Sequence, residues 1–444
     1  MRIRLFMLLF FGALAVNLLA QDQVLLQAEK LRGEMHLLEQ AILANPGQVN
    51  QVQKLAKKSL QMDSLWLIQE RSLPKEKISR RPKVHAPEGA LELLRHERHA
   101  ILDYFIGNRM LHIFVVTRKS THYLTVPIHL QFQKEVDAFI CQVTQPEMPL
   151  STKAFRLASN ALYQILIAPL QDNIQEIDQL TIIPDPGIRF LPFEALVRPA
   201  PKPMDDFRHL PYLLQDYGIG YAFSIAQLVR AYHHARGSLP EICTFLSPEY
   251  AASRPEIAAE RTALLASWPL TPAKAAFSSP DSLQNHPASM AHFMGPILKA
   301  PAFTPSTSIL TADFHGMLVT SSDLAARPCL SANHSAARSL VLTLENAHAQ
   351  SIVAAIWHSP SAARLRIMRN FYQELADREY VDQALRFARI HYLETAANNQ
   401  THPYYWAGYM QFNDFSPVKE QPKFPWYIVF FGGLALIILL GKKL

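Results

Sequence analysis

A long apolar run opens the chain. It extends from Leu5 to Leu19, follows Arg2 and Arg4, and gives way to polar residues after Ala20. A charged start, an apolar middle and a small residue at the boundary are typical of a secretory signal peptide, which we predict over residues 1–20. This segment is either cleaved after export or kept as an anchor.

A second apolar run lies near the C-terminus, from Phe424 to Leu440, and Lys442 and Lys443 follow it. In a helix these residues span ~25 Å at about 1.5 Å each, which fits the hydrocarbon core of a slightly thin bilayer. We therefore predict one transmembrane helix over residues 424–441, with the two lysines on the cytoplasmic side. Together the two runs predict a single-pass membrane protein whose main domain lies on the exported, periplasmic side.

Residues 22–75 show the pattern of a short α-helical pair. Apolar residues recur at steps of three and four, and Asn45-Pro46-Gly47 divides the stretch. These apolar positions are Val24, Ala28, Leu31, Met35 and Leu38 in the first half, and Val52, Leu55, Leu60 and Leu65 in the second. The pattern is typical of one unit of a helical-repeat array, although no second copy follows at a fixed period. A basic connector with several prolines, Pro74 to Pro87, ends this region.

From about residue 88, short apolar runs alternate with amphipathic stretches. The runs lack regular polar alternation, so we predict strands buried on both faces. They are His112–Val116, Leu180–Ile183, Ile242–Phe245 and Ile352–Trp357. Amphipathic helices are predicted around Phe371 and around Leu385. Alternating strands and helices predict an α/β fold in which helices flank a sheet.

Composition narrows the candidate chemistry. The net charge of +6 is spread along the chain without a basic arm, which argues against nucleic-acid binding. With only 15 glycines the chain has no glycine-rich phosphate loop, so no nucleotide cofactor is expected. The three cysteines, Cys141, Cys243 and Cys329, are too far apart for a C-x-x-C metal site. His96 and His99 are one residue short of a zinc-binding H-E-x-x-H spacing, and we interpret their segment as a solvated helix face.

Several segments between residues 88 and 412 match one known module in order and spacing. They are Asp103–Gly107, Ile113–Val116, Ala161–Leu170, Ile183–Leu196, Ala354–Trp357 and His402–Gly408. This region resembles the CHAT domain, a caspase-like module often found behind helical repeats in bacterial proteins. The resemblance implies a caspase-haemoglobinase fold with a Cys-His dyad. In such a dyad a thiolate attacks the scissile carbonyl and the histidine transfers the protons.

The chain departs from the family pattern at both dyad positions. The family's histidine stands second in H-x-x-x-H-G, where this chain retains only the first histidine, His292, and carries Pro296 at the second. The family's cysteine, in L-S-A-C-x-T-G, is replaced by Asn333. A carboxamide cannot become a thiolate, and loss of a covalent nucleophile costs about 10⁶ in rate. Pro328 also interrupts the strand expected to lead to Asn333. These departures predict a pseudopeptidase that binds a protein or peptide.

The alternative is an active cysteine endopeptidase with a relocated Cys-His pair, and Cys329, His315 and His334 are its candidates. Cys329 lies four residues before Asn333, ~13 Å away in an extended strand, which is too far to replace the lost nucleophile. We expect Cys329 to be a buried structural thiol, His315 to belong to a hairpin turn, and His292 to pack beside the vacant site. A third hypothesis is a scaffold for which the helical pair is the docking surface.

Overall fold

The computed structural model describes most of residues 94–413. Within that range it describes residues 94, 96–107, 109–144, 151–200, 204, 206–223, 225, 228, 242–266, 274–277, 290–295, 298–299, 304–305, 312, 314, 317–321, 340–345, 347–377 and 380–413, and outside it Lys30 and Glu34. The predicted signal peptide, almost all of the helical pair and the predicted membrane span at 424–441 lie outside the described residues. No helix within the described part is both long and apolar enough to cross a membrane.

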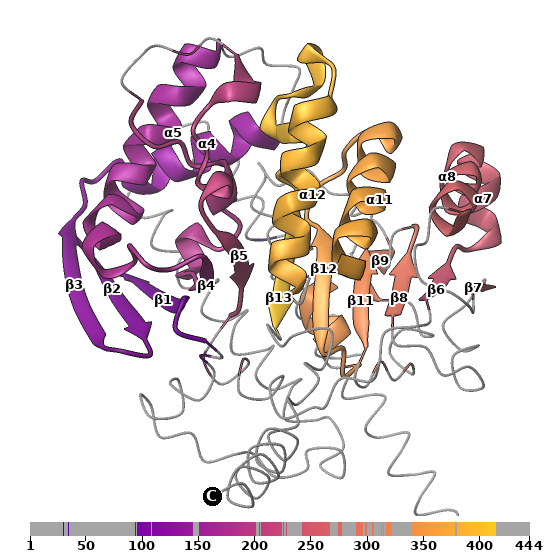
Figure 1. The fold of residues 1–444 in the computed structure, drawn as a ribbon, viewed down its shortest axis with the longest axis horizontal. Coiled ribbons are helices and arrows are strands. Elements are labelled where there is room, and N and C mark those ends of the chain that lie inside the picture. Colours follow the sequence, from indigo (N-terminus) through magenta and orange to yellow (C-terminus); the bar gives the residue numbers. More distant parts are fainter. Residues whose placement is uncertain are drawn as a thin grey trace, which may run out of the picture.

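One large mixed sheet organises the described region (Figure 1). It has eleven strands in the order β3-β2-β1-β4-β5-β13-β12-β11-β8-β6-β7. The strands are β1 (His99–Ile106), β2 (Met110–Thr117), β3 (Thr121–Pro127), β4 (Gln179–Ile183), β5 (Gly218–Tyr221), β6 (Ile242–Phe245), β7 (Lys274–Phe277), β8 (Met290–Phe293), β11 (Leu318–Ser321), β12 (Ser351–Ala355) and β13 (Tyr409–Asn413). A separate two-stranded sheet pairs β9 (Leu298–Lys299) with β10 (Thr304–Pro305).

The sheet combines an antiparallel margin with parallel strands. β1, β2 and β3 form an antiparallel meander, and β1 then pairs with β4 in parallel. β13 runs antiparallel to β12, whereas β12, β11, β8, β6 and β7 are parallel neighbours. Parallel neighbours need crossover connections, which accounts for the alternation of strands and helices along the chain. The predicted α/β sheet with flanking helices is confirmed at this level.

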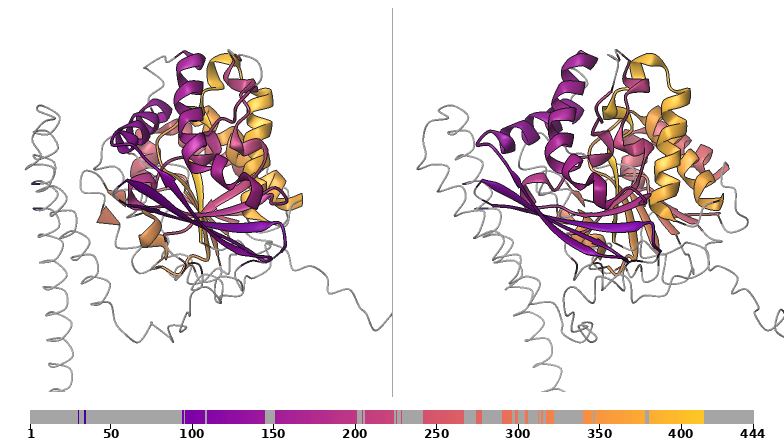
Figure 2. Two further views of the ribbon diagram at one scale, coloured as in Figure 1. Left: turned by 90° about the vertical axis from the view of Figure 1, so that its left-hand side faces the viewer. Right: turned by 60° about the vertical axis from the view of Figure 1, so that its left-hand side comes forward.

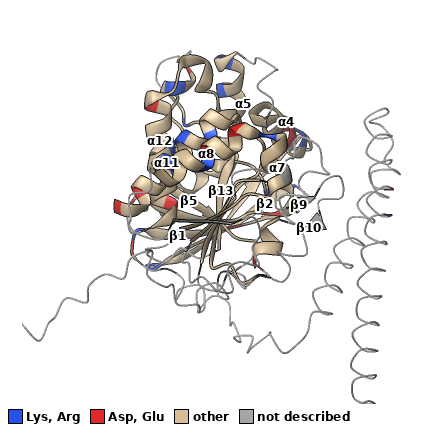
Figure 3. Cartoon of the chain, turned by 90° about the vertical axis from the view of Figure 1, so that its right-hand side faces the viewer, with Lys and Arg blue, Asp and Glu red and all other residues tan. Residues whose placement is uncertain are grey.

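Helices lie against the sheet. They are α4 (Phe132–Thr144), α5 (Thr152–Leu166), α7 (Pro248–Ser253), α8 (Pro255–Ala266), α11 (Ser361–Asp377) and α12 (Val381–Thr395). Seen edge-on, these helices gather on one side of the sheet (Figures 2 and 3). Figure 3 also shows that Lys, Arg, Asp and Glu are interspersed over the helices without a stripe of one sign. This distribution agrees with the spread of charge along the sequence.

Most of the predicted buried strands are confirmed. Every residue of β4, β6 and β12 is buried, because both faces of these strands are covered. β2 is different, since His112 is half-buried and Phe114 is exposed on one face. The prediction of burial on both faces is therefore wrong for β2, which lies near the margin of the sheet. The presence of an aromatic residue in the sequence does not show whether another part of the chain covers its side chain.

The segment around His96 was also predicted wrongly. Residues 96–98 form a bend and turn, and β1 begins at His99, so there is no helix face for the two histidines to share. The His99 side chain is buried and its Nε2 lies 2.8 Å from Thr181 Oγ1. The pairing of β1 with β4 in the sheet overrides the local polar pattern.

Candidate functional site

The region implied by the family pattern centres on β8 and its neighbours. β8 carries His292, which is opposite Thr320 of β11 on one side and Thr244 of β6 on the other. β8 ends at Phe293 and β11 at Ser321, and these two residues are also paired. Parallel strands end at one edge of a sheet, and in open α/β sheets binding sites lie just outside the carboxyl ends.

The His292 side chain belongs to a small polar cluster between the sheet and α11. Its Nδ1 lies 2.6 Å from the hydroxyl of Tyr372, and that hydroxyl lies 2.7 Å from Thr320 Oγ1. All three side chains are buried, and Thr320 Oγ1 also reaches the Ala291 carbonyl at 3.4 Å. A consistent order of donors runs from His292 Nδ1–H through Tyr372 and Thr320 to this carbonyl. We call His292, Tyr372 and Thr320 the His292 cluster.

Burial sets the protonation of the His292 cluster. Desolvation lowers the pKa of His292 to about 3, and the positive charge of Arg364 acts in the same direction. Desolvation also raises the pKa of Tyr372 far above its ordinary value, so its hydroxyl stays protonated. The imidazole is therefore neutral near pH 7. His292 Nε2 is buried and has no hydrogen-bond partner among the described residues.

This arrangement suits packing better than proton transfer. A general base works best when its pKa is near the operating pH and when it can reach the reacting group. His292 has neither property, because its pKa is about 3 and its side chain is enclosed beneath α11. The hydrogen bonds instead join α11 to β8 and β11.

The two described cysteines do not form a dyad with His292. Cys243 of β6 is opposite Ala291, whereas Thr244 is opposite His292. Because successive side chains of a strand point to opposite faces, the Cys243 thiol and the His292 imidazole lie on different faces of the sheet. Cys141 belongs to α4, which packs on α5, and Figure 1 shows both helices far along the sheet from β8.

The other predicted site residues lie outside the described part of the chain. These are Pro296, His315, Cys329, Asn333 and His334. Pro328 and the strand expected to lead to Asn333 also lie outside it. The structure thus tests neither the vacant nucleophile position nor the relocated pair, and both stay predictions. It does place β11, whose last residue is Ser321, directly beside β8.

Sequence reasoning missed Tyr372 and Thr320. Tyr372 lies in an amphipathic helix whose stripe was interpreted only as apolar packing, and Thr320 belongs to a strand that was not predicted. The spacing of these residues carries no motif, because they are 52 residues apart and meet only through the fold. A tyrosine in an otherwise apolar stripe is the one available signal, since a buried Tyr hydroxyl usually needs a partner.

A second buried network fixes residues 193–194, within the Ile183–Leu196 segment that resembles the CHAT domain. Arg389 of α12 donates to Glu194 Oε1 at 2.9 Å, and Tyr221 of β5 donates to Glu194 Oε2 at 2.6 Å. Arg389 also bonds to the Tyr409 carbonyl, and the Phe193 amide donates to the Tyr221 hydroxyl at 3.1 Å. All of these side chains are buried. Glu194 and its partners thus join the turn after β4 to β5, α12 and β13.

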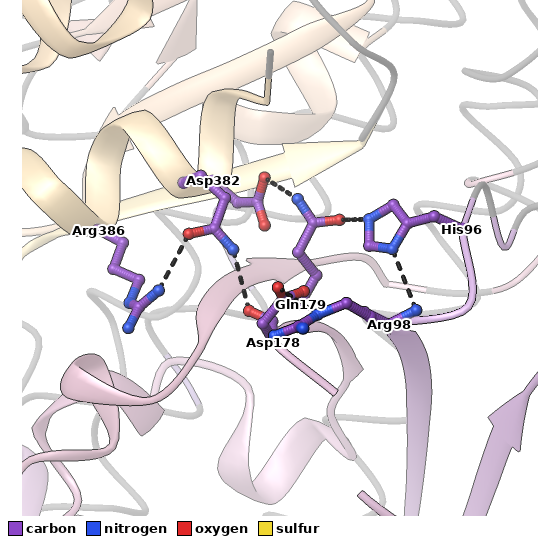
Figure 4. A network of polar contacts seen from close by, with 7 residues as sticks. His96, Arg98, Asp178, Gln179, Asp382 and Arg386 are labelled. Carbon is purple, nitrogen blue, oxygen red and sulfur yellow. Dashed lines mark hydrogen bonds and ion pairs between the residues drawn. The ribbon is translucent and has the colours of Figure 1, made fainter. Parts of the chain in front are cut away.

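A third network lies where β4 begins, beside the first turn of α12 (Figure 4). Gln179, the first residue of β4, donates to Asp382 Oδ1 at 3.1 Å, and the His96 ring bonds to the other end of the Gln179 amide. Gln383 donates to the Asp178 carbonyl at 3.0 Å and accepts from Arg386 at 3.2 Å. Burial raises the pKa of Asp382 to about 7. This network joins the start of α12 to the start of β4.

Comparisons with known proteins identify the family. Two crystal structures of the Saccharomyces cerevisiae separase-securin complex resemble the fold, with TM-scores of 0.47 and 0.45 and 9% sequence identity. Each match covers 74% of this chain and 31% of the other, so this chain spans about a third of the length of those chains. No curated protein matches the sequence. The family model of the CHAT domain matches residues 156–414, which is more than half of the chain. The chain therefore belongs to the CHAT domain family.

Proposed function

We propose that this CHAT domain protein is a membrane-anchored, exported pseudopeptidase that acts by binding a protein or peptide. The observation that carries the proposal is the state of His292, the histidine that remains from the family pattern. It is enclosed between β8 and α11, bonded to Tyr372, and neutral because burial lowers its pKa to about 3. Such an imidazole cannot accept a proton from a thiol at neutral pH.

The sequence supports the same proposal at the positions outside the described residues. Pro296 stands where the family has its base, and a proline has no titratable side chain. Asn333 stands where the family has its nucleophile, and its neutral amide is a poor attacking group. The chemistry needs both partners, so loss of either suffices to abolish covalent catalysis.

A binding role remains open to a fold that has lost its nucleophile. Open α/β sheets bind ligands beyond the carboxyl ends of their strands, and this location depends on topology rather than on a catalytic side chain. The central strands β8 and β11 end at this edge. The export and anchoring parts of the proposal rest on the apolar runs at residues 5–19 and 424–440.

The test uses the full chain in a mild detergent with a fluorogenic peptide library that samples acidic and basic residues before the scissile bond. We expect no turnover above the detergent blank, and we expect the same result after treatment with a thiol alkylator. Turnover that the alkylator abolishes would overturn the proposal and favour the relocated dyad. Cys329→Ala then decides between thiols, with Cys243→Ala as its matched control.

The binding arm uses the same library without cleavage, immobilised as an array. We expect the full chain to retain a subset of peptides, and residue preferences within that subset define the partner's chemistry. Uniform retention no greater than that of a scrambled array would contradict peptide binding.

A further inference from the structure

The β1–β3 margin of the sheet carries an uncovered aromatic surface. Phe105 of β1, His112 and Phe114 of β2, and Tyr123 of β3 lie on one face, because Phe105 is opposite His112 and Phe114 is opposite both Asp103 and Tyr123. Phe105 is 60% exposed, Phe114 43% and Tyr123 57%. We call these four residues the aromatic sheet face. Figure 2 shows α4 and α5 on the other side of these strands.

The side chains of the aromatic sheet face are ordered by contacts with one another. The Phe114 and Tyr123 rings lie 4.9 Å apart, and the Phe105 and His112 rings 5.8 Å apart. His112 stacks on Tyr123 and its Nδ1 lies 2.7 Å from the tyrosine hydroxyl. Aromatic rings that are already ordered by contacts with one another lose little side-chain entropy when a partner covers them. Contiguous exposed apolar patches of this kind mark interaction surfaces.

The segment that precedes β1 already covers another part of the same sheet face, around Ile101 and Val116. Ile101 and Val116 are opposite one another and are buried in a small apolar cluster with Leu94. Leu94 is fully buried, and its carbonyl accepts a hydrogen bond from Arg118 Nε at 2.9 Å. Ile101 and Phe105 are four residues apart on one strand, or about 13 Å. The segment immediately before β1 therefore lies on this face, next to its uncovered part.

The sequence upstream of Leu94 supplies a matching occupant. The predicted helices in residues 22–72 have apolar stripes, from Val24 to Leu38 and from Val52 to Leu65, and such a stripe needs a surface to cover it. The 21 residues from 73 to 93 reach about 70 Å when extended, so the connector does not prevent contact. A covalent tether also gives the pair a high effective concentration at the face, which favours it over a second copy of the chain.

We propose that the aromatic sheet face is the docking surface for the helical pair of the same chain. The pair packs its apolar stripes against Phe105, Phe114 and Tyr123 and continues the cover that Leu94 begins. The helical pair and the CHAT domain then form one body rather than two units joined by a loose connector. This inference does not depend on whether the domain is a pseudopeptidase.

Hydrogen exchange of the full chain, followed by mass spectrometry, tests the proposal. The variant Phe105→Ser/Phe114→Ser/Tyr123→Ser removes the aromatic rings at exposed positions. The control, Leu130→Ser/Leu157→Ser, removes two exposed leucines, 78% and 58% exposed, from outside the aromatic sheet face. We expect peptides from residues 22–72 to exchange at least tenfold faster in the triple variant and at the parent rate in the control. Unchanged exchange of α12 and β12 peptides verifies folding, and Tyr123→Ser alone replaces the triple variant if that check fails.

Photocrosslinking identifies the occupant independently. With p-benzoylphenylalanine at position 123, we expect crosslinks to residues 22–72 within the same chain at every protein concentration. Crosslinks only between chains, rising with concentration, would assign the face to a second copy and overturn the proposal. Unaltered exchange of residues 22–72 in the triple variant, or unprotected exchange in the parent, would overturn it as well.

Discussion

The carboxyl group of Asp382 makes the stability of this domain depend on pH near neutrality. Asp382 lies in the first turn of α12, is 3% exposed, and accepts a hydrogen bond from Gln179. Burial raises its pKa from 3.8 to about 7, while the backbone N–H groups of Gln383 and of Asp382 itself act in the opposite direction. The folded protein therefore binds a proton that the unfolded chain releases between about pH 4 and 7.

The sign of the effect follows from that difference. Because the folded state holds more protons between these pH values, the free energy of unfolding falls as pH rises from about 4 to about 7 and is then constant for this group. A difference of about three pKa units corresponds to about 4 kcal/mol at most. Asp382→Asn retains the shape and removes the ionisation. We expect the variant to be more stable than the parent by on the order of 2–4 kcal/mol at pH 8, and by only about 1 kcal/mol at pH 4.5.

Urea unfolding at several pH values measures this difference. Trp357 and Trp406 are buried, so their fluorescence reports loss of the core. The control is Asp377→Asn, which removes an exposed carboxylate at the end of α11. Parallel stability curves for the parent and Asp382→Asn from pH 4.5 to 8 would refute the reasoning, because Asp382 would then titrate alike in the folded and unfolded states.

Three further substitutions test the buried groups. Arg389→Ala leaves the buried Glu194 carboxylate without its cation. We expect the free energy of unfolding, measured in urea at pH 7, to fall by about 3–5 kcal/mol. A fall below about 1 kcal/mol, which is typical of an ion pair on the surface, would contradict the burial of this pair. The His292 imidazole takes up a proton near pH 6.5 in the unfolded chain but near pH 3 in the folded protein, so the free energy of unfolding falls as pH drops through this range. Between pH 7 and 4.5 we expect His292→Asn to lose about 3 kcal/mol less stability than the parent. An identical loss in both proteins would disprove this account of His292. Gly408→Ala places a Cβ 2.9 Å from the Trp357 ring, and we expect about 1–3 kcal/mol of destabilisation and a lower melting temperature, whereas an unchanged melting temperature would show that the ring moves without strain.

The strand predictions show what local pattern can establish. Leu180–Ile183, Ile242–Phe245 and the start of Ile352–Trp357 were predicted as strands buried on both faces, and β4, β6 and β12 occupy these positions. A strand covered on both sides has no solvent-facing position, so its apolar run is continuous. The prediction was wrong for β2, because the sequence does not show whether a phenylalanine such as Phe114 is covered by other parts of the fold.

The candidate site was predicted only in part. The order and spacing of short segments identified the CHAT domain, because a family pattern consists of residue types at given positions along the chain. His292 was expected to pack beside a vacant site, and the structure places it in a closed cluster with Tyr372 and Thr320. These contacts join residues 52 and 80 positions apart, and no spacing rule links them.

By itself the sequence determined the family and the α/β class, since each depends on which side chains stand in which order, and it predicts Pro296 and Asn333 at the dyad positions. The tertiary structure alone decided that β11 lies beside β8, that α11 encloses His292, and that Asp382 holds its proton to about pH 7. The physical reason is that a pKa or a hydrogen bond depends on the atoms surrounding a group, and strand order in the sheet selects those atoms from distant parts of the chain.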